Sequence, residues 1–400
     1  MRVVLLTGEY PPLRGGVADY TALLGAGLTR HGVEVSVLTS ERATPRGEDS
    51  AVRVYPSLKS WGADLWRDVV QQLDILEPDV LHIQYQTGAF DMKIGVNLVP
   101  WINRLRRPRT RTVVTYHDLK QPYLLPKIGP IRHLATWILG AGADAVITTT
   151  AEDFQRLAGR VTSETTRWTW GRRQLRIIPI GSNIPAELPT TYDRRTWRES
   201  LGVRDDECLL AFFGFLAPSK GVHTLVSAFE QLVKRGLAVR LLMIGASSGD
   251  TGNSEWRYVN TIRQRLDQPE FRGRIGWTGY VGALDVAGYL RAADLCVLPF
   301  KDGASLRHGT LIAAFVQHLP VITTIPQNQN APRGFPTLVS GENCLLVPTE
   351  APEQLAQAIE QLARDFSLRS RLSAGVARLA VSFQWDAIAL ANLRLYQSIL

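Results

Sequence analysis

Cysteine is scarce in this 400-residue sequence, and no two cysteines are spaced for pairing. Cys208, Cys296 and Cys344 lie far apart inside apolar segments, and no CxxC pair occurs. This spacing argues against a disulfide framework and against a cysteine-based metal site. It indicates buried, reduced thiols in a cytoplasmic protein.

Long hydrophobic runs are also missing. The stretch LATWILGAGA, residues 134–143, has about half of the roughly 18 apolar residues that a membrane-spanning helix needs. The apolar part of the N-terminal MRVVLLTGEYPP is too short for a signal peptide, so we expect a first strand there. The sequence therefore predicts no membrane span and a cytoplasmic location.

Signatures of cofactor and metal sites are absent as well. There is no GxGxxG dinucleotide fingerprint and no DxD pair that would chelate a divalent cation on a diphosphate, and the seven histidines are scattered. We therefore expect no cofactor and no metal. Any charge that develops on a leaving group must then be stabilised by the protein's own cations and amides.

What the chain does contain is an alternation of strand-like and helix-like segments along its whole length. The first half has β-branched or apolar runs at residues 2–7, 33–39, 79–85, 111–117, 143–150 and 175–180. The second half has such runs at residues 208–215, 239–245, 274–280, 295–300, 320–324 and 344–348. Near-continuously apolar strands in this alternation predict an α/β fold with parallel sheets covered by helices on both faces.

The series of strands restarts after a polar, proline-containing connection at residues 183–200, which indicates two domains. We place residues 1–184 in the first Rossmann-like domain and residues 185–382 in the second. Residues 383–400 have apolar side chains with the spacing of one helix face. Ligands of parallel α/β sheets bind beyond the carboxyl ends of the strands, so site residues are expected in the loops that follow strands.

Two such loops in the first half carry candidate site residues. Gly15 and Gly16 follow the first strand and precede a helical stretch, where backbone N–H groups can meet an anion; a plain turn is the alternative. His117 and Asp118 end the fourth strand. An imidazole there can bind a hydroxyl or phosphate, or move a proton; a structural histidine is the alternative.

In the second half, two helix starts are predicted to bind one diphosphate. One strand ends at Gly214, and Lys220 then adds an ammonium group to the positive end of a helix; a surface lysine near a turn is the alternative. The stretch PFKDGASLRHGTLIAAFVQHLP, residues 299–320, contains the other start. Its helix begins with Gly309, Thr310 and Leu311, whose N–H groups have no partner within a helix.

Arg307 and His308 directly precede that helix and are expected to add positive charge. The net charge of the whole chain is +8, and arginine supplies most of its cations. Such a balance suits ligands that carry phosphate.

With these motifs in order, the chain resembles the large retaining family four of glycosyltransferases, which have the GT-B fold. The likeness covers nearly all 400 residues. It is carried by EYPPLRGGVADYT, DVLHIQY, VVTYHD, IIPIGSNI, GFLAPSKGVHTLVSAF, LLMIG, WTGY, AADLCVLPF, HLPVITT and GENCLLVP. The resemblance implies two facing Rossmann-like domains, with the acceptor on the side of the first and the nucleotide sugar held mostly by the second. It also implies that the last helix packs back on the first domain.

The resemblance further implies roles for single residues. Gly15 and Gly16 fall on the family's glycine loop, near the acceptor and the donor phosphate, and His117 falls on its active-site histidine. Lys220 falls on the cation that holds the donor diphosphate. The family's phosphate-binding backbone amides correspond to residues 309–311.

Two carboxylates of the family are missing from this chain. The family usually has two glutamates eight positions apart, one for the donor sugar and one for the ribose, and here these positions hold Ser305 and Ala313. Phe215 replaces an arginine that is common before the diphosphate lysine. We predict that Asp302, three residues earlier in the same loop, reaches the sugar in place of the lost glutamate.

The sequence thus predicts a metal-independent glycosyltransferase that moves a sugar from a nucleotide diphosphate to a sugar or lipid-linked acceptor with retained anomeric configuration. His117, Asp302 and Ser305 are its predicted catalytic residues. Two alternatives stay open. One is a nucleotide-sugar epimerase or hydrolase on the same fold, and the other is an inactive scaffold subunit that binds the donor, which Ser305 and Ala313 favour.

Two basic stretches point to a partner surface. They are RLRRPRTR at residues 104–111 and RWTWGRRQLR at residues 167–176. Arginine with tryptophan suits an anionic lipid interface, so one interpretation is peripheral contact with the cytoplasmic face of a membrane. The other interpretation is a pair of solvated loops. No nucleic-acid partner is expected, because no recognised binding motif accompanies the charge.

Overall fold

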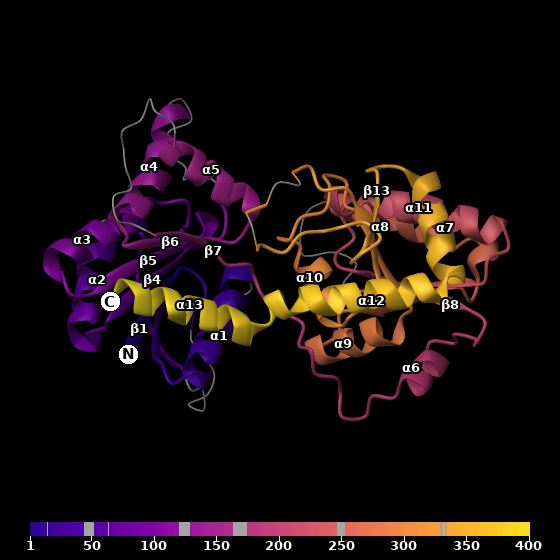
Figure 1. Ribbon diagram of the computed structural model, residues 1–400, viewed down its shortest axis with the longest axis horizontal. Coiled ribbons are helices and arrows are strands. Elements are labelled where there is room, and N and C mark those ends of the chain that lie inside the picture. Colours follow the sequence, from indigo (N-terminus) through magenta and orange to yellow (C-terminus); the bar gives the residue numbers. More distant parts are fainter. Residues whose placement is uncertain are drawn as a thin grey trace. The chain divides into compact units, whose positions relative to one another are not determined.

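The computed structural model describes residues 1–13, 15–43, 52–62, 64–119, 129–162, 174–245, 253–328, 331–332 and 334–400. The chain forms two compact units. The first comprises Met1–Gly181, Asn330–Phe335 and Trp385–Leu400, and the second comprises Ser182–Gln329 and Pro336–Gln384. Each unit is an α/β structure on one parallel sheet (Figure 1), which confirms the predicted fold class.

The first unit has a seven-stranded sheet of order β3-β2-β1-β4-β5-β6-β7 in which all neighbours are parallel. Its strands are β1 Arg2–Thr7, β2 Glu34–Ser40, β3 Arg53–Leu58, β4 Val80–Tyr85, β5 Arg111–Tyr116, β6 Ala145–Thr148 and β7 Gln174–Ile177. Strand β3 was not expected from the sequence, because Pro56 lies within it. It forms an edge of the sheet, where the missing N–H of a proline is tolerated.

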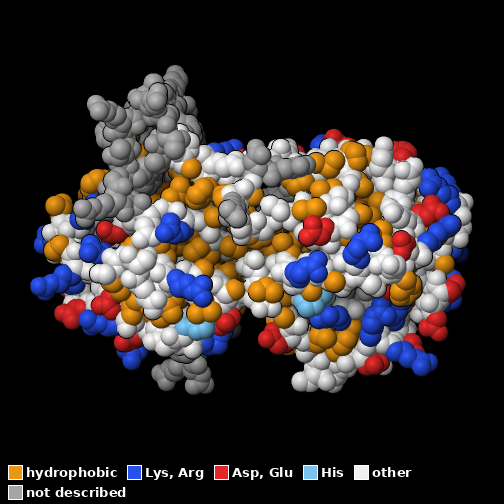
Figure 2. All heavy atoms as spheres, viewed as in Figure 1, with side chains coloured by type: hydrophobic (Ala, Val, Ile, Leu, Met, Phe, Trp, Pro, Cys, Tyr) orange, Lys and Arg blue, Asp and Glu red, His pale blue; other side chains and the backbone are white. Residues whose placement is uncertain are grey.

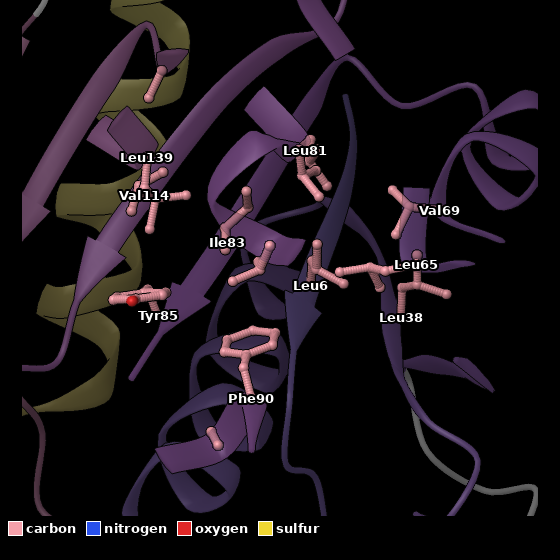
Figure 3. Close-up of a cluster of buried hydrophobic side chains, with 14 of the residues drawn as sticks. Leu6, Leu38, Leu65, Val69, Leu81, Ile83, Tyr85, Phe90, Val114 and Leu139 are labelled. Atoms are coloured by element: carbon pink, nitrogen blue, oxygen red, sulfur yellow. The ribbon is translucent and has the colours of Figure 1, made fainter. Parts of the chain in front are cut away.

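Hydrophobic clusters cover both faces of this sheet, as near-continuously apolar strands require. On one face Leu6 of β1 and Ile83 of β4 pack with Phe90 and with Leu65 of helix α2 (Asp64–Leu76) (Figure 3). On the other face the cluster joins strands β1, β2 and β4 to helices at both ends of the chain. Full burial of one such side chain contributes about 1.5–3 kcal/mol.

The helical elements of the first unit are α1 Gly16–Arg30, α2 Asp64–Leu76, η1 Gly88–Phe90, η2 Gly95–Leu98, α3 Val99–Arg106, α4 Gly129–Gly142, α5 Ala151–Thr162 and α13 Trp385–Ile399. The C-terminal helix α13 packs against α1 (Figure 1). A Cβ on Gly27 of α1 would lie 2.9 Å from the Cβ of Ala389, so glycine permits this close approach. The prediction that the last helix returns to the first domain is confirmed.

The second unit has a six-stranded parallel sheet of order β10-β9-β8-β11-β12-β13. Its strands are β8 Cys208–Phe213, β9 Val239–Ile244, β10 Ile275–Gly279, β11 Leu295–Leu298, β12 Val321–Thr324 and β13 Leu345–Val347. The helical elements are α6 Arg194–Ser200, η3 Pro218–Lys220, α7 Val222–Lys234, α8 Asn253–Leu266, η4 Pro269–Phe271, α9 Ala283–Ala292, α10 Gly309–Val316, α11 Pro352–Arg364, α12 Phe366–Ala380 and η5 Val381–Phe383. No helix in the described part of the chain is long and apolar enough to span a membrane.

The strand order of each sheet reverses direction at one point. The reversal lies between β1 and β4 in the first unit and between β8 and β11 in the second. In parallel α/β sheets, such a reversal is the place where ligands generally bind. The candidate residues of both units lie in loops that follow these strands or their neighbours.

Candidate functional site

The loops that follow β8 and β11 are joined by their backbones. The N–H of Lys301 donates to the carbonyl oxygen of Ser219 at 3.0 Å. Gly221 has a φ of 67°, and a Cβ there would lie 1.7 Å from the carbonyl oxygen of Pro299. Only glycine combines this backbone conformation with this contact. The close approach of the two loops therefore requires a glycine at position 221, directly before α7.

Gly214, at the end of β8, lies beside the first turn of α10. Its φ is 137°, and its N–H donates to the carbonyl oxygen of Ile244 at 3.0 Å. A Cβ on Gly214 would lie 3.3 Å from the Cγ2 of Thr310. Gly214 and Thr310 were both predicted to bind the diphosphate. They are 96 positions apart in sequence (310 minus 214), and they are neighbours in the structure.

Lys220 and His308 lie against the same aromatic ring, that of Phe300. The ammonium nitrogen of Lys220 lies 5.2 Å from the ring centroid, and the His308 imidazole stacks on the ring with centroids 3.7 Å apart. A lysine over an aromatic ring gains about 0.5–1 kcal/mol at exposed sites and more when it is desolvated. Phe300 was missed in the sequence, where it reads as the end of a buried strand.

The electrostatics of this cluster correct one expectation. Burial, and then the positive charges of Lys220 and Arg307, lower the pKa of His308 to about 4. His308 is therefore neutral at neutral pH and does not add the positive charge that the sequence suggested. Burial also lowers the pKa of Lys220. The positive charge before α10 thus comes from Lys220 and Arg307.

Helix α10 begins with two available N–H groups. The N–H groups of Gly309 and Thr310 donate to no described residue, and His308, the N-cap, gives α10 no side-chain cap. The N–H of Leu311, by contrast, donates to the carbonyl oxygen of His308 at 2.9 Å. Leu311 was predicted to offer its amide to the phosphate, and the structure shows that amide already engaged.

Thr310 has a second group that favours an anion. Its hydroxyl oxygen is buried and has no hydrogen-bond partner among the described residues. Buried polar atoms are normally paired, so this hydroxyl can accept or donate one further hydrogen bond at the helix start. The sequence prediction used only the backbone of this residue.

Ser305 shapes the turn that leads into α10. Its hydroxyl accepts from the N–H of Arg307 at 3.3 Å, and its carbonyl oxygen accepts from the N–H of His308 at 2.9 Å. Its own N–H donates to the Nδ1 of His308 at 3.3 Å. Whether Ser305 also contacts a sugar stays a prediction.

Asp302, the predicted replacement for a lost glutamate, and Ala313, which occupies the position of the other glutamate, differ in exposure. Asp302 is exposed and makes no hydrogen bond or ion pair with any described residue. Ala313 is fully buried within α10. The loop therefore offers one accessible carboxylate, and the role of Asp302 stays a prediction.

In the first unit, His117 contacts the carboxyl end of β4 and helix α1. Its N–H donates to the carbonyl oxygen of Tyr85 at 2.9 Å, and its Nε2 lies 3.0 Å from the side-chain oxygen of Gln84. Burial lowers the pKa of His117 to about 3, so the ring is neutral. Because an amide oxygen only accepts, Nε2 carries the proton in this amide orientation and Nδ1 is left as an acceptor.

Tyr20 connects His117 with the predicted glycine loop. The Tyr20 ring meets the His117 ring edge-on, with centroids 4.5 Å apart. Tyr20 lies on α1, which begins at Gly16 and has Gly15 as its N-cap. The predicted residues Gly15, Gly16 and His117 thus belong to one region of the first unit. Tyr20 and Gln84 were missed because both contacts are long-range in sequence.

A carboxylate lies against the glycine loop. A Cβ on Gly15 would lie 2.0 Å from the Oε2 of Glu9, so glycine leaves room for that side chain. Burial, and then the charge of Asp91, raise the pKa of Glu9. A carboxylate accepts hydrogen bonds from hydroxyls and repels phosphate, so this helix start suits a sugar better than a diphosphate. Glu9 was missed, although GEYPP follows the first strand.

Both units match models of glycosyltransferase families. Residues 15–168 match a family model described as "Glycosyl transferase 4-like domain", and residues 207–365 match one described as "Glycosyl transferases group 1". The chain belongs to the group 1 glycosyltransferases. The resemblance found in the sequence motifs is thereby confirmed.

Two curated relatives align with nearly the whole glycosyltransferase. A D-inositol 3-phosphate glycosyltransferase of Xylanimonas cellulosilytica is 26% identical over 433 residues, covering 99% of this chain and 96% of the relative. An uncharacterised glycosyltransferase of Methanocaldococcus jannaschii is 22% identical over 416 residues, covering 99% of this chain and 98% of the relative.

Solved structures share the fold of the glycosyltransferase. Sucrose-phosphate synthase from Thermosynechococcus elongatus is 22% identical with a TM-score of 0.69, covering 100% of this chain and 98% of that one. HepE of Anabaena in complex with UDP-glucose is 18% identical with a TM-score of 0.67, and both chains are covered completely, at 100%. These likenesses confirm the predicted GT-B architecture.

Proposed function

We propose that this glycosyltransferase moves a sugar from a nucleotide diphosphate to an acceptor, without a metal and with retention of the anomeric configuration. One observation carries the proposal. Lys220 and the start of α10 meet around the Phe300 ring, so an ammonium group and two available N–H groups belong to one loop cluster. The similarity to HepE, whose structure holds UDP-glucose, supports a nucleotide-sugar donor.

The second unit would stabilise the departing diphosphate. When the bond between the anomeric carbon and the phosphate oxygen breaks, negative charge grows on that oxygen. The ammonium of Lys220, the guanidinium of Arg307 and the positive end of α10, with about half a unit charge, oppose it. These groups are positioned before the reaction, so little reorganisation is needed when the charge appears.

The acceptor hydroxyl would attack from the face that the diphosphate leaves. A bond forms between the acceptor oxygen and the anomeric carbon, and the hydroxyl proton passes to the departing phosphate oxygen. This route gives retention without a protein nucleophile, and it agrees with Ser305 and Ala313 standing at the family's two carboxylate positions.

In the first unit, we propose that the neutral ring of His117 binds a hydroxyl group of the donor sugar or of the acceptor. That hydroxyl would donate a hydrogen bond to Nδ1 of His117. Glu9 would accept from a second hydroxyl beside the glycine loop. Asp302, the exposed carboxylate before α10, would reach the donor sugar. The acceptor is a sugar or a lipid-linked sugar, met in the cytoplasm or at the cytoplasmic face of a membrane.

A turnover assay tests this function. The wild-type enzyme is incubated with a panel of uridine, guanosine and adenosine diphosphate sugars, with and without sugar and glycolipid acceptors, in a chelator. We expect nucleoside diphosphate release that depends on an acceptor, and a product whose anomeric signal in NMR matches that of the donor. An inverted product, or turnover that requires a divalent metal, would contradict the proposal.

The absence of carboxylates at Ser305 and Ala313 favours a second candidate, a subunit that binds the donor without using it. This candidate predicts donor-dependent thermal stabilisation with no product on any acceptor. Conversion of the donor in the absence of any acceptor would instead indicate an epimerase or hydrolase.

A further inference from the structure

An exposed apolar row runs along η2 and α3 in the first unit. Ile94 is 41% exposed, Leu98 36%, Trp101 37% and Leu105 84%. The spacing of Leu98, Trp101 and Leu105 by three and four residues places these three on one face of α3 and its start, and Ile94 precedes η2. We call these four residues the α3 row. Isolated exposed apolar residues are ordinary, but a contiguous row marks a surface that is covered by a partner.

Polar contacts hold the segment that carries the row, and one of them comes from Trp101 of the row itself. The Asn97 side-chain amide donates to the carbonyl oxygen of Ala135 at 2.7 Å, and the indole N–H of Trp101 donates to that of Ile138 at 2.9 Å. The side-chain amide of Asn103 donates to Thr112 Oγ1 at 2.9 Å. These contacts hold the segment against α4 and β5, with the Trp101 indole turned toward α4 and with Leu98 and Leu105 exposed.

Basic side chains flank the row. Lys93, Arg106 and Arg109 are exposed, and none of the three makes an ion pair with a described residue. Figure 2 shows hydrophobic, basic and acidic side chains over the part of the first unit where Figure 1 labels α3. The basic stretch predicted at residues 104–111 therefore borders an apolar surface. The other stretch, residues 167–176, lies largely outside the described residues.

We propose that the α3 row docks the enzyme on an anionic membrane surface. Exposed leucine and isoleucine side chains fit the boundary between headgroups and acyl chains. Unpaired cations beside them match anionic headgroups, whose attraction is about 1 kcal/mol per basic residue near the surface. A protein partner with an apolar groove would not need this cationic border.

The start of the row lies toward the edge of the sheet that carries His117. η1, η2 and the row follow the carboxyl end of β4, and His117 follows the carboxyl end of the neighbouring strand β5. Both loops therefore leave the same edge of the sheet, while α3 runs back to the start of β5, so Leu105 and Arg109 lie toward the opposite edge. The proposal goes beyond the proposed function, which would hold equally for a water-soluble acceptor.

Vesicle flotation tests the proposal. The full-length enzyme is floated with phosphatidylcholine vesicles, with and without phosphatidylglycerol, at low and high salt. We expect binding only to the anionic vesicles. Leu105→Glu, which adds a negative charge to the row, should reduce binding by about tenfold or more, since burial of one leucine is worth at least one such factor. The double variant Arg106→Gln, Arg109→Gln should bind the anionic vesicles more weakly than the wild-type enzyme. Its binding should also depend less on the salt concentration.

A matched variant on the second unit controls for surface charge. Leu284 on α9 is 48% exposed, and Leu284→Glu should float like the wild-type enzyme. Each variant should keep its thermal stabilisation by the donor, which separates this test from that of the proposed function. Absence of binding to anionic vesicles would overturn the proposal, as would unchanged flotation of Leu105→Glu. So would a wild-type dimer in sedimentation that Leu105→Glu converts to a monomer, because the row would then cover a second copy.

Discussion

Burial keeps three histidines of this protein neutral at physiological pH. The pKa of His82 and of His117 is lowered to about 3, and that of His308 to about 4, in each case first by burial. His82 is fully enclosed, with its Nδ1 2.5 Å from the Tyr396 hydroxyl and its Nε2 2.7 Å from the Thr115 hydroxyl. A neutral imidazole at His117 can hold a hydroxyl but does not supply a proton at neutral pH.

These histidines predict a loss of stability on mild acidification. Their folded pKa lies below the ordinary value of 6.5, so the unfolded chain takes up protons that the folded chain does not, and stability falls as pH drops below 6.5. The free energy of unfolding falls by about 1.4 kcal/mol per pH unit for each histidine that is protonated in the unfolded chain and neutral in the folded chain. Urea unfolding between about pH 6.5 and 5, above the range of most carboxylates, measures it.

His117→Asn serves as the control for this slope. It removes one of the three groups, so its stability should fall less steeply with pH than that of the wild-type protein. Parallel slopes for the two proteins would show that His117 titrates normally in the folded state.

Gln84 is predicted to position His117 for catalysis. Gln84→Leu removes the acceptor from Nε2, so the ring can turn. We expect kcat to fall by about tenfold, within the range for a misplaced catalytic group, with little change in the KM for the donor. Initial rates over a range of donor concentrations give both values.

Gln84→Glu provides the matched variant. A buried carboxylate beside the ring raises the pKa of His117, so activity should be lost as pH falls through that raised value, while the wild-type rate stays flat there. If both variants merely lowered stability and left the pH profile of kcat unchanged, Gln84 would be a structural residue only.

At the level of helices and strands, the sequence predicted most of the fold because local patterns determine it. The strands of the second unit are short apolar runs separated by helical stretches, and each appears where the pattern placed it. β3 was missed because its pairing with β2 is what stabilises a strand that contains Pro56. Lys220 and the start of α10 were predictable, because both are read from residues adjacent in sequence.

The contacts between elements were not predictable in the same way. Phe300, Tyr20, Gln84 and Glu9 acquire their roles through neighbours that are distant in the chain, and one sequence carries no signal for such pairs. The engaged amide of Leu311 also depends on the conformation of the preceding turn rather than on residue type.

Two glycines at the ends of α7 separate backbone strain from loop contact. Gly221 and Gly236 both have positive φ, 67° and 76°. A Cβ on Gly221 would collide with Pro299, whereas one on Gly236 would meet nothing within 4 Å. We expect Gly236→Ala to destabilise the protein by about 1 kcal/mol, and Gly221→Ala by about 3 kcal/mol or more, with loss of donor binding.

Thermal unfolding and donor titration of the two variants measure this difference. Equal destabilisation by the two alanines, with donor binding intact in both, would show that the loops after β8 and β11 can separate without consequence for the site.

At the scale of the whole molecule, the chain builds two Rossmann-like units and closes the first with its own C-terminal helix. The first unit carries a neutral histidine, a carboxylate beside a glycine loop and the α3 row. The second carries the cations and the free helix start. From this division we expect hydroxyl-bearing ligands at the first unit and the phosphate-bearing donor at the second.

The central claim is that the second unit holds a diphosphate by Lys220 and the start of α10 without a metal. Calorimetric titration with the nucleoside diphosphate of the active donor, in the presence of a chelator, tests it most directly. We predict that the wild-type enzyme binds, that Lys220→Ala binds about tenfold or more weakly, as loss of a charged hydrogen bond implies, and that Lys234→Ala at the other end of α7 binds like the wild type. Equal affinity of Lys220→Ala and the wild type, or binding abolished by the chelator, would contradict the account.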